Sequence, residues 1–241
     1  MALKNSLKTI IKKIPIRFTS NQKYDAQTKR IMNIVLERHS TFVDVGCHKG
    51  EVLSKALKIA NVGKHFAFEP IPSEFSKVNN KFGNICSVKN LAIGNKTGKT
   101  TFNYVTSNPA YSGIKMRTYP KDEQVETIQI QLDTLDNQLK QHDRVDMIKI
   151  DVEGAELEVL KGAKKIIEKF HPIIVFEHGL GASDHYNTSP EDILSFFDDH
   201  QYQLFTLKGF IADEPALLRN EFIDFYLTNK EYYFLAKLRV S

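Results

Sequence analysis

The stretch that decides the fold is Thr41-Phe-Val-Asp-Val-Gly-Cys-His-Lys-Gly50, followed by Phe66-Ala-Phe-Glu-Pro70. An apolar, β-branched run that stops at a glycine turn and passes into a helical pattern predicts a strand feeding a helix. The carboxyl edge of such a strand is where α/β sheets bind nucleotides. Gly46 and Gly50 allow a tight turn and a close ligand, because neither has a Cβ. Glu69 is expected to end the next strand, where a carboxylate can accept both hydroxyls of a ribose.

The composition of the turn indicates which nucleoside ligand it binds. A dinucleotide site usually shows G-x-G-x-x-G, whereas this turn has one glycine fewer and places Asp44 ahead of the first. A carboxylate there repels a pyrophosphate and suits a cationic ligand, and S-adenosylmethionine carries both an ammonium and a sulfonium. We therefore expect Asp44, Gly46, His48, Gly50 and Glu69 to bind S-adenosylmethionine. A plain tight connection without a ligand is the alternative interpretation of the turn.

Length and composition predict one soluble domain. The chain has 241 residues, of which 41% are hydrophobic and 26% charged, and we find no repeat or low-complexity tract. The longest apolar runs fall far short of the roughly 20 residues that a membrane span needs. Two cysteines make neither a disulfide framework nor a metal knuckle. We expect a reducing, cytoplasmic setting.

The charge is concentrated at the start of the chain. Residues 1–30 hold eight Lys and Arg against Asp25 alone, a net charge of +7, which leaves −3 for the rest of a chain whose total is +4. Apolar residues recur there at helical spacing with lysines between them, which predicts a cationic amphipathic helix rather than a signal peptide: Leu3, Leu7, Ile10, Ile11 and Ile14. We divide the chain into a basic helical arm, 1–40, and a binding domain, 41–241. The arm either docks on the body or contacts the inner face of an anionic membrane.

The remaining pattern alternates between strands and helices as a parallel sheet requires, which predicts a doubly wound α/β fold. The expected strands are 41–45, 65–68, 85–89, 100–105, 127–132, one that begins at 145, 173–178, 202–207 and 232–238. The expected helices are 51–60, 73–82, one that reaches 165, and 190–200. Ser73 is well placed to cap its helix. The direction of the last strand is left open by its pattern.

Polar side chains gather where two of these strands end. Asp151 and Glu153 follow the strand that begins at 145, and Glu177 and His178 close the strand 173–178. Because parallel strands end at one edge of a sheet, we expect three acids and a histidine close together. Each of the four is a candidate general base, and the three acids together could ligate a Mg²⁺ ion.

Each candidate also has a structural alternative. Glu153 and Glu156 could serve only as acids in the first turn of a helix, and His178 could be a structural hydrogen bonder. Lys149 lies inside an apolar strand, and a buried ammonium must be paired. We therefore expect Lys149 to pair with a nearby acid and to support the site.

Several motifs lie between about residues 40 and 207: Asp44-x-Gly46-x-x-x-Gly50, Phe68-Glu69-Pro70, Asn90-Leu-Ala92-Ile-Gly94, Leu132-Asp133-x-Leu135, Lys149-Ile-Asp151-Val-Glu153-Gly154-Ala-Glu156 and Leu160-Lys-Gly162. Together they resemble the FkbM-type methyltransferases. The resemblance implies a seven-stranded class I, Rossmann-like fold with one antiparallel strand near the C-terminus, S-adenosylmethionine as cofactor, and O-methylation of a hydroxyl on a sugar, glycan or other small metabolite. On this resemblance Pro70, Asn90 and Ala92 join the cofactor site.

Three other functions are weighed against this one. The first is a methyltransferase-fold binding module without turnover. The second is nucleic-acid methylation, since Asn108-Pro-Ala-Tyr111 resembles a motif of base-modifying methyltransferases, but it stands about forty residues too early, and the body's negative charge argues against it. The third, a nicotinamide-dependent oxidoreductase, lacks the expected glycines. Tyr111, Tyr186 and the loop 179–190 are expected to cover the acceptor.

Overall fold

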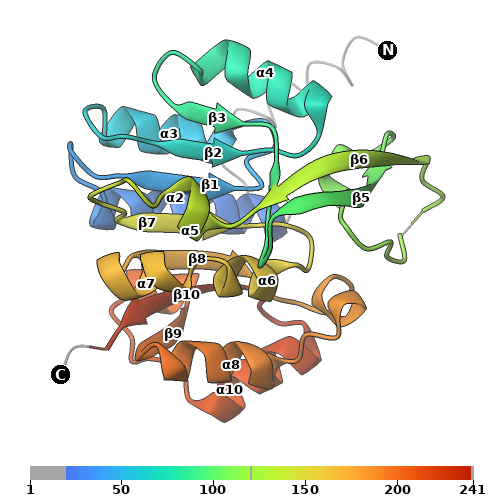
Figure 1. Ribbon diagram of the computed structural model, residues 1–241. Coiled ribbons are helices and arrows are strands. Elements are labelled where there is room, and N and C mark those ends of the chain that lie inside the picture. Colours follow the sequence, from blue (N-terminus) through green and yellow to red (C-terminus); the bar gives the residue numbers. More distant parts are fainter. Residues whose placement is uncertain (1–19, 120, 240–241) are drawn as a thin grey trace, which may run out of the picture.

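The computed structural model describes residues 20–119 and 121–239, which build a central sheet with helices on both faces (Figure 1). Seven strands lie in the order β3-β2-β1-β7-β8-β10-β9. Their bounds are β1 (Phe42–Val45), β2 (Phe66–Phe68), β3 (Ser87–Lys89), β7 (Met147–Ile150), β8 (Ile173–Glu177), β9 (Tyr202–Thr206) and β10 (Tyr233–Leu238). All neighbouring pairs are parallel except those of β10, which runs antiparallel to both β8 and β9. The predicted fold class, including its antiparallel strand, is confirmed.

The helices divide between the two faces because alternate strand residues point to opposite sides. Val43 and Ile148 pack with one set of helices, which are α5 (Leu135–Gln138), α6 (Glu156–Lys161), α7 (Lys164–Phe170), α8 (Pro190–Asp199) and α10 (Arg219–Thr228). Phe42 and Met147 pack with the other set, which are α2 (Ser20–Val35), α3 (Glu51–Ile59), α4 (Pro72–Phe82) and α9 (Leu207–Ile211). Every residue of β1 and β7 is buried. The two central strands are therefore a rigid base for the loops that follow them.

A second, smaller sheet projects beyond the carboxyl edge of the first, at the right of Figure 1. It has the order β4-β6-β5 and consists of β4 (Ala92–Ile93), β5 (Gly98–Val105) and β6 (Val125–Asp133). Phe102, Ile130 and Leu132 form its own small core. The loop between β5 and β6 contains a short 3₁₀ turn, η1 (Pro109–Tyr111). We call β5, this loop and β6 the hairpin.

Three local predictions need correction. Helix α4 begins after Ile71, with Pro72 in its first turn and no side-chain cap, so Ser73 is not the cap. The helix expected to reach 165 is two helices, which separate at Gly162, where a Cβ would stand 1.9 Å from the Gly94 carbonyl oxygen. Leu207 begins α9 instead of ending a strand, since the Thr206 side chain accepts from the Gly209 amide.

The described part of the predicted arm is α2, which packs against α3 and α9. Tyr24, Ile31 and Met32 on α2 are buried. The amphipathic helix expected at 3–14 lies outside the described residues, so its docking stays a prediction. Among the residues that the structure describes, no helix is long and apolar enough to cross a membrane.

Candidate active site

A cavity of about 240 Å³ opens where β1, β2, β7 and β8 end. Its floor comes from the residues after these strands, and its roof from the hairpin loop. The floor includes Gly46, His48, Glu69, Pro70, Ile71, Asp151, Glu153 and Glu177, and the roof includes Pro109, Ala110, Ser112 and Ile114. The cavity therefore lies at the carboxyl edge predicted from the sequence. The neighbours of Tyr111 in the hairpin loop line it but Tyr111 does not, so the expectation that Tyr111 covers an acceptor stays a prediction.

Glu69 is fixed at one end of this cavity. Its carboxylate accepts from the backbone amides of His48 and Ile71, both at 2.9 Å. The Asn90 amide donates to the carbonyls of Glu69 at 2.9 Å and of Pro70 at 3.0 Å. Burial raises the pKa of Glu69 to about 7, although the hydrogen bonds from the His48 and Ile71 backbone amides oppose this shift. Asn90 thus holds the loop, and Glu69 presents a preorganised acceptor to the cavity.

The glycines of the first turn are required by the protein's own packing. Gly46 has a φ of 76°, and a Cβ there would lie 1.9 Å from the Asp151 carbonyl oxygen. Gly50 has a φ of 67° and precedes α3, where a Cβ would lie 2.8 Å from the Phe82 ring. Only Gly46 lines the cavity. Gly46 therefore lets the turn after β1 pack against the loop after β7, and Gly50 lets the start of α3 pack against Phe82 of α4.

Asp44 lies differently from its predicted role. Its side chain is fully buried, does not line the cavity, and stands 3.7 Å from the Lys149 ammonium. Burial raises its pKa to about 6, although Lys149 opposes this shift. The sequence pattern predicts a cationic ligand beside Asp44, but the protein's own lysine occupies that place. Direct contact between Asp44 and a cofactor is therefore wrong for this geometry.

Lys149 joins this buried carboxylate to the site. Its ammonium donates to Asp151 at 3.0 Å and to the Gly46 carbonyl at 3.4 Å. The Tyr233 hydroxyl donates to the same Asp151 oxygen at 2.6 Å. Burial raises the pKa of Asp151, but Lys149 and Tyr233 outweigh it and leave the pKa below its ordinary value. The expected pairing of Lys149 is confirmed, and Asp151 is held ionised at the cavity wall.

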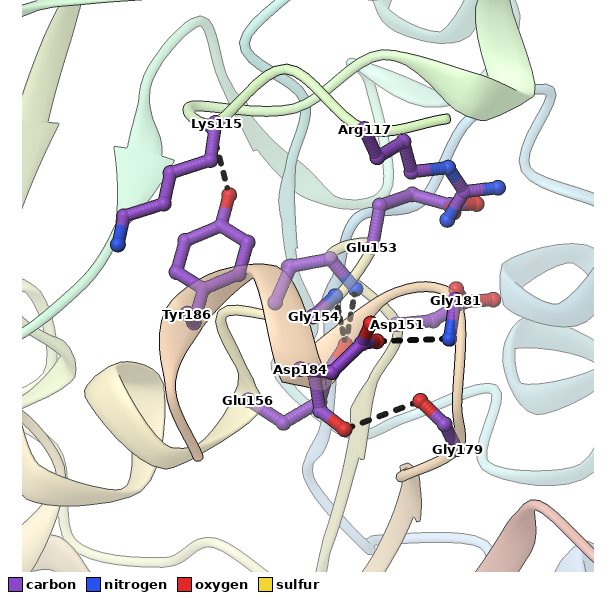
Figure 2. A network of polar contacts seen from close by, with 12 residues as sticks. Lys115, Arg117, Asp151, Glu153, Gly154, Glu156, Gly179, Gly181, Asp184 and Tyr186 are labelled. Carbon is purple, nitrogen blue, oxygen red and sulfur yellow. Dashed lines mark hydrogen bonds and ion pairs between the residues drawn. The ribbon is translucent and has the colours of Figure 1, made fainter. Parts of the chain in front are cut away.

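Glu153 and Glu177 line the same cavity, but their pKa values are raised where that of Asp151 is lowered. Burial and the charge of Asp151 raise the pKa of Glu153 to about 8 and that of Glu177 well above its ordinary value. Carboxylate oxygens from Asp151, Glu153 and Glu177 lie within 4.8 Å of one another. Arg117, from the hairpin loop, forms an ion pair with Glu153 (Figure 2). The cluster therefore holds one acid that is kept ionised beside two that bind protons more tightly than usual, and it has the oxygen ligands that a divalent cation prefers.

Glu156 supports the loop from below. Its carboxylate accepts from the Val152 and Gly154 amides at 3.1 Å each, as Figure 2 shows for Gly154. Gly154, in the β7–α6 loop, packs against the loop 179–190, because a Cβ on it would stand 2.4 Å from the Ala182 carbonyl oxygen. Glu156 is thus structural and lies in the first turn of a helix, as predicted. The loop 179–190 lies under the β7–α6 loop, and none of its residues lines the cavity.

His178 does not face the cavity either. It is 1% exposed, and its ring stacks on Phe222 and Tyr226 at centroid distances of 5.9 and 4.7 Å. Neither ring nitrogen has a hydrogen-bond partner among the described residues. Burial lowers its pKa to about 4, so the ring is neutral. The prediction of His178 as a general base is contradicted by this placement.

The cavity also contains residues that the sequence patterns did not single out. Tyr233 comes from β10, and Asn21 and Asp25 come from α2. Tyr233 offered no signal beyond a strand with aromatic residues. Asn21 and Asp25 lie in a segment whose dominant signal is its basic charge, so only the tertiary structure brings them to the site. Ala92 lines the cavity, as predicted.

This doubly wound sheet, with an acid-lined cavity at its carboxyl edge and Glu69 at the end of β2, has the architecture of a class I methyltransferase. Residues 44–204 match the family model of the methyltransferase FkbM domain. The chain therefore belongs to the FkbM methyltransferase family, and this membership implies S-adenosylmethionine as the methyl donor. A search of curated proteins finds no match.

Solved structures of methyltransferases are similar to the chain. An FkbM methyltransferase from Methylobacillus flagellatus KT shares 21% identity at a TM-score of 0.48, over 70% of this chain and 40% of that one. Precorrin-6y C5,15-methyltransferase from Geobacter metallireducens GS-15 shares 12% identity at a TM-score of 0.46, over 78% of this chain and 75% of that one. A putative rRNA methylase from Clostridium thermocellum shares 12% identity at a TM-score of 0.46, over 90% of this chain and 96% of that one. The chain thus spans less than half the length of the first of these proteins.

Proposed function

We propose that this protein is an S-adenosylmethionine-dependent O-methyltransferase whose acceptor is a hydroxyl on a sugar, glycan or related small metabolite. The observation that carries the proposal is one cavity with two chemically different ends. Glu69 stands at one end as a fixed acceptor for ribose hydroxyls. Asp151, Glu153 and Glu177 stand at the other end, where a cationic sulfonium and an acceptor hydroxyl are both favoured.

The residues present fit a bound cofactor. Glu69 would hold the ribose, and the backbone of Gly46 and His48 would lie along the cofactor's middle. The His48 Nε2 is buried and has no hydrogen-bond partner among the described residues, so a ligand can supply one. The carboxylate cluster makes the far end electronegative, which suits the sulfonium. The cofactor would supply an electrophilic methyl group at that end.

The chain's residues then have to orient an acceptor and move one proton. The acceptor oxygen must lie in line behind the carbon–sulfur bond that breaks as the oxygen–carbon bond forms. Asp151, kept ionised by Lys149 and Tyr233, accepts the hydroxyl proton. The hairpin loop covers the cavity through Pro109, Ala110 and Ser112 and excludes water from the transfer.

The test measures binding and transfer separately. Calorimetry with S-adenosylhomocysteine is expected to show binding that Glu69→Gln weakens strongly, whereas Asp151→Asn binds but does not transfer a labelled methyl group to hydroxylated sugars. Glu126→Gln, an exposed acid on the hairpin, is the control and should behave as wild type. Absence of binding to the folded protein contradicts the proposal. Binding without transfer to any acceptor favours the alternative of a binding module.

A divalent metal is a separate part of the proposal. Asp151, Glu153 and Glu177 could hold Mg²⁺, which would lower the pKa of the acceptor hydroxyl. Activity is then expected to fall on EDTA treatment and to return with Mg²⁺ or Mn²⁺. Full activity after exhaustive EDTA treatment contradicts the metal.

The proposal includes no nucleic-acid substrate, because the chain beyond residue 30 carries a net charge of −3. RNA or DNA binding that weakens steeply with salt would contradict this. Peripheral membrane contact through the basic arm, 1–40, is a second prediction. It is tested by co-sedimentation with anionic vesicles, which deletion of residues 1–18 should abolish.

A further inference from the structure

Helix α2 forms part of the cavity wall, although it lies outside the segment 44–204 that matches the family model. Its residues Asn21 and Asp25 line the cavity together with Tyr233. Asp25 is the only acid among the first 30 residues of the chain. A strongly basic segment therefore brings one carboxylate into the site.

Contacts with the end of the chain fix α2 in this position. Lys23 and Tyr24 both donate to the Glu231 carboxylate, the lysine at 2.8 Å. The Tyr24 ring stacks on that of Tyr233 with 5.0 Å between centroids. Asn21 accepts from the Tyr232 hydroxyl at 2.7 Å. Because these contacts hold α2 just before Asp25, and Ile31 and Met32 are buried after it, the position of Asp25 in the wall is determined by the fold.

Among the described residues, none forms an ion pair with the Asp25 carboxylate. It is half-buried and makes no hydrogen bond or ion pair with any residue between 20 and 239 that the structure describes. Burial raises its pKa, and the charges of Lys29 and Lys149 oppose that shift. A partly buried carboxylate without a partner is unfavourable unless a ligand provides one. The missing partner is a cation.

The two faces of the sheet indicate which cation this is. The acid cluster lies under the hairpin roof, where the methyl group must meet the acceptor. Asp25 comes from the opposite side, on the face that carries α2 and α3. Asp44, the acid that the sequence pattern favoured for cation recognition, is instead occupied by Lys149. The remaining cation of the cofactor is the ammonium of its amino-acid end.

We propose that Asp25 binds the α-ammonium group of the cofactor, so that α2 completes the cofactor site with a residue from outside the family-matched segment. This inference rests on the proposed function. A charge-assisted hydrogen bond of this kind stabilises a complex by about 1.5–3 kcal/mol, or roughly tenfold to hundredfold in affinity.

The experiment compares two ligands on one variant. S-adenosylhomocysteine carries the amino-acid end, and 5′-methylthioadenosine has the same nucleoside and sulfur without it. In calorimetry, Asp25→Asn is expected to weaken S-adenosylhomocysteine about tenfold or more and to leave 5′-methylthioadenosine unchanged. Asp199→Asn, the same change at an exposed position at the end of α8, is the matched control and should alter neither affinity.

Each outcome is interpretable. Equal affinity of wild type and Asp25→Asn for S-adenosylhomocysteine overturns this inference and leaves the proposed function intact. An equal loss for both ligands also overturns it, because the substitution then acts on the nucleoside and not on the ammonium. Wild type that binds neither ligand overturns the proposed function itself. Thermal melting of Asp25→Asn is expected to match wild type, since the carboxylate makes no bond within the described protein.

Discussion

At the scale of single residues, one lysine connects a buried carboxylate to a carboxylate that lines the cavity. Lys149 lies between Asp44, which never reaches the cavity, and Asp151, which lines it. The sequence predicted that this ammonium must be paired, and it correctly placed Asp151 and Glu69. It misplaced Asp44 and His178, because the pattern puts a side chain near the end of a strand but does not say whether that side chain reaches the cavity.

Replacing Lys149 tests this connection. Lys149→Met leaves Asp44 buried without its cation, and removal of one partner of a buried pair costs about 3–5 kcal/mol. Asp44→Asn removes the stranded charge, so the double variant should recover part of the loss. Urea unfolding of the four members of the cycle measures this coupling. Losses that simply add would show that the two side chains do not interact energetically.

His178 makes a prediction about pH. Its folded pKa of about 4 lies below the unfolded value of 6.5, so between these values the unfolded chain binds more protons and wild type loses stability as pH falls. His178→Phe lacks this titration and keeps the stacking on Phe222 and Tyr226. Its advantage over wild type should grow as pH falls from 7 and reach about 2 kcal/mol at pH 5. Chemical unfolding at several pH values measures it.

The same variant also tests the catalytic role that the sequence suggested. Methyl transfer at pH 7.5 should persist in His178→Phe, because the ring does not line the cavity. Loss of transfer in a folded variant with unchanged cofactor affinity would restore His178 as a base.

At the scale of elements, the main sheet was predictable and the docking of its additions was not. Strands β1, β2, β7 and β8 are short apolar runs closed by turns, which is a strong signal. Helix α2 is held by Glu231 and Tyr233, more than 200 positions away in the chain. No local pattern encodes such a contact. The break after α6 likewise lies where Gly162 meets the Gly94 carbonyl, nearly 70 positions earlier in the chain.

The hairpin is tied to the site by Arg117, whose guanidinium lies 4.9 Å from the centre of the Tyr111 ring and forms the ion pair with Glu153. Arg117→Met removes the cation that opposes the raised pKa of Glu153. The pKa of Glu153 should therefore rise above about 8, which carboxyl-carbon NMR can follow, and amide exchange in the loop between β5 and β6 should become faster. A roof that is held by other contacts would leave the exchange unchanged.

Arg144→Met is the matched control for this prediction. Arg144 also pairs with an acid, Asp146, but it lies just ahead of β7, at the opposite end of that strand from Glu153. The pKa of Glu153 and the exchange of the hairpin loop should not change in this variant. A similar shift in both variants would mean that the effect comes from overall charge and not from the ion pair.

At the scale of the whole molecule, the fold gathers five acidic side chains in one cavity. The chain is basic overall at +4, yet the cavity is lined by Asp25, Glu69, Asp151, Glu153 and Glu177. Four of these side chains, all except Asp151, hold protons more tightly than usual because burial raises their pKa. The sequence showed the basic start and the acidic body. It could not show that the acids share one poorly solvated space, which is what couples their titration.

This coupling predicts that cofactor binding releases protons. Glu69 and Glu153 have pKa values of about 7 and about 8 without a ligand, and a cation or a hydrogen-bond donor in the cavity favours their charged forms. Groups protonated in the free protein and ionised in the complex lose protons on binding, so affinity should rise between pH 6 and pH 8.

Calorimetry with S-adenosylhomocysteine at pH 7 should be more exothermic in Tris than in phosphate, because Tris releases heat when it takes up a proton. Glu153→Gln should reduce this difference, and identical heats in the two buffers would show that the carboxylates keep their protons when the ligand enters.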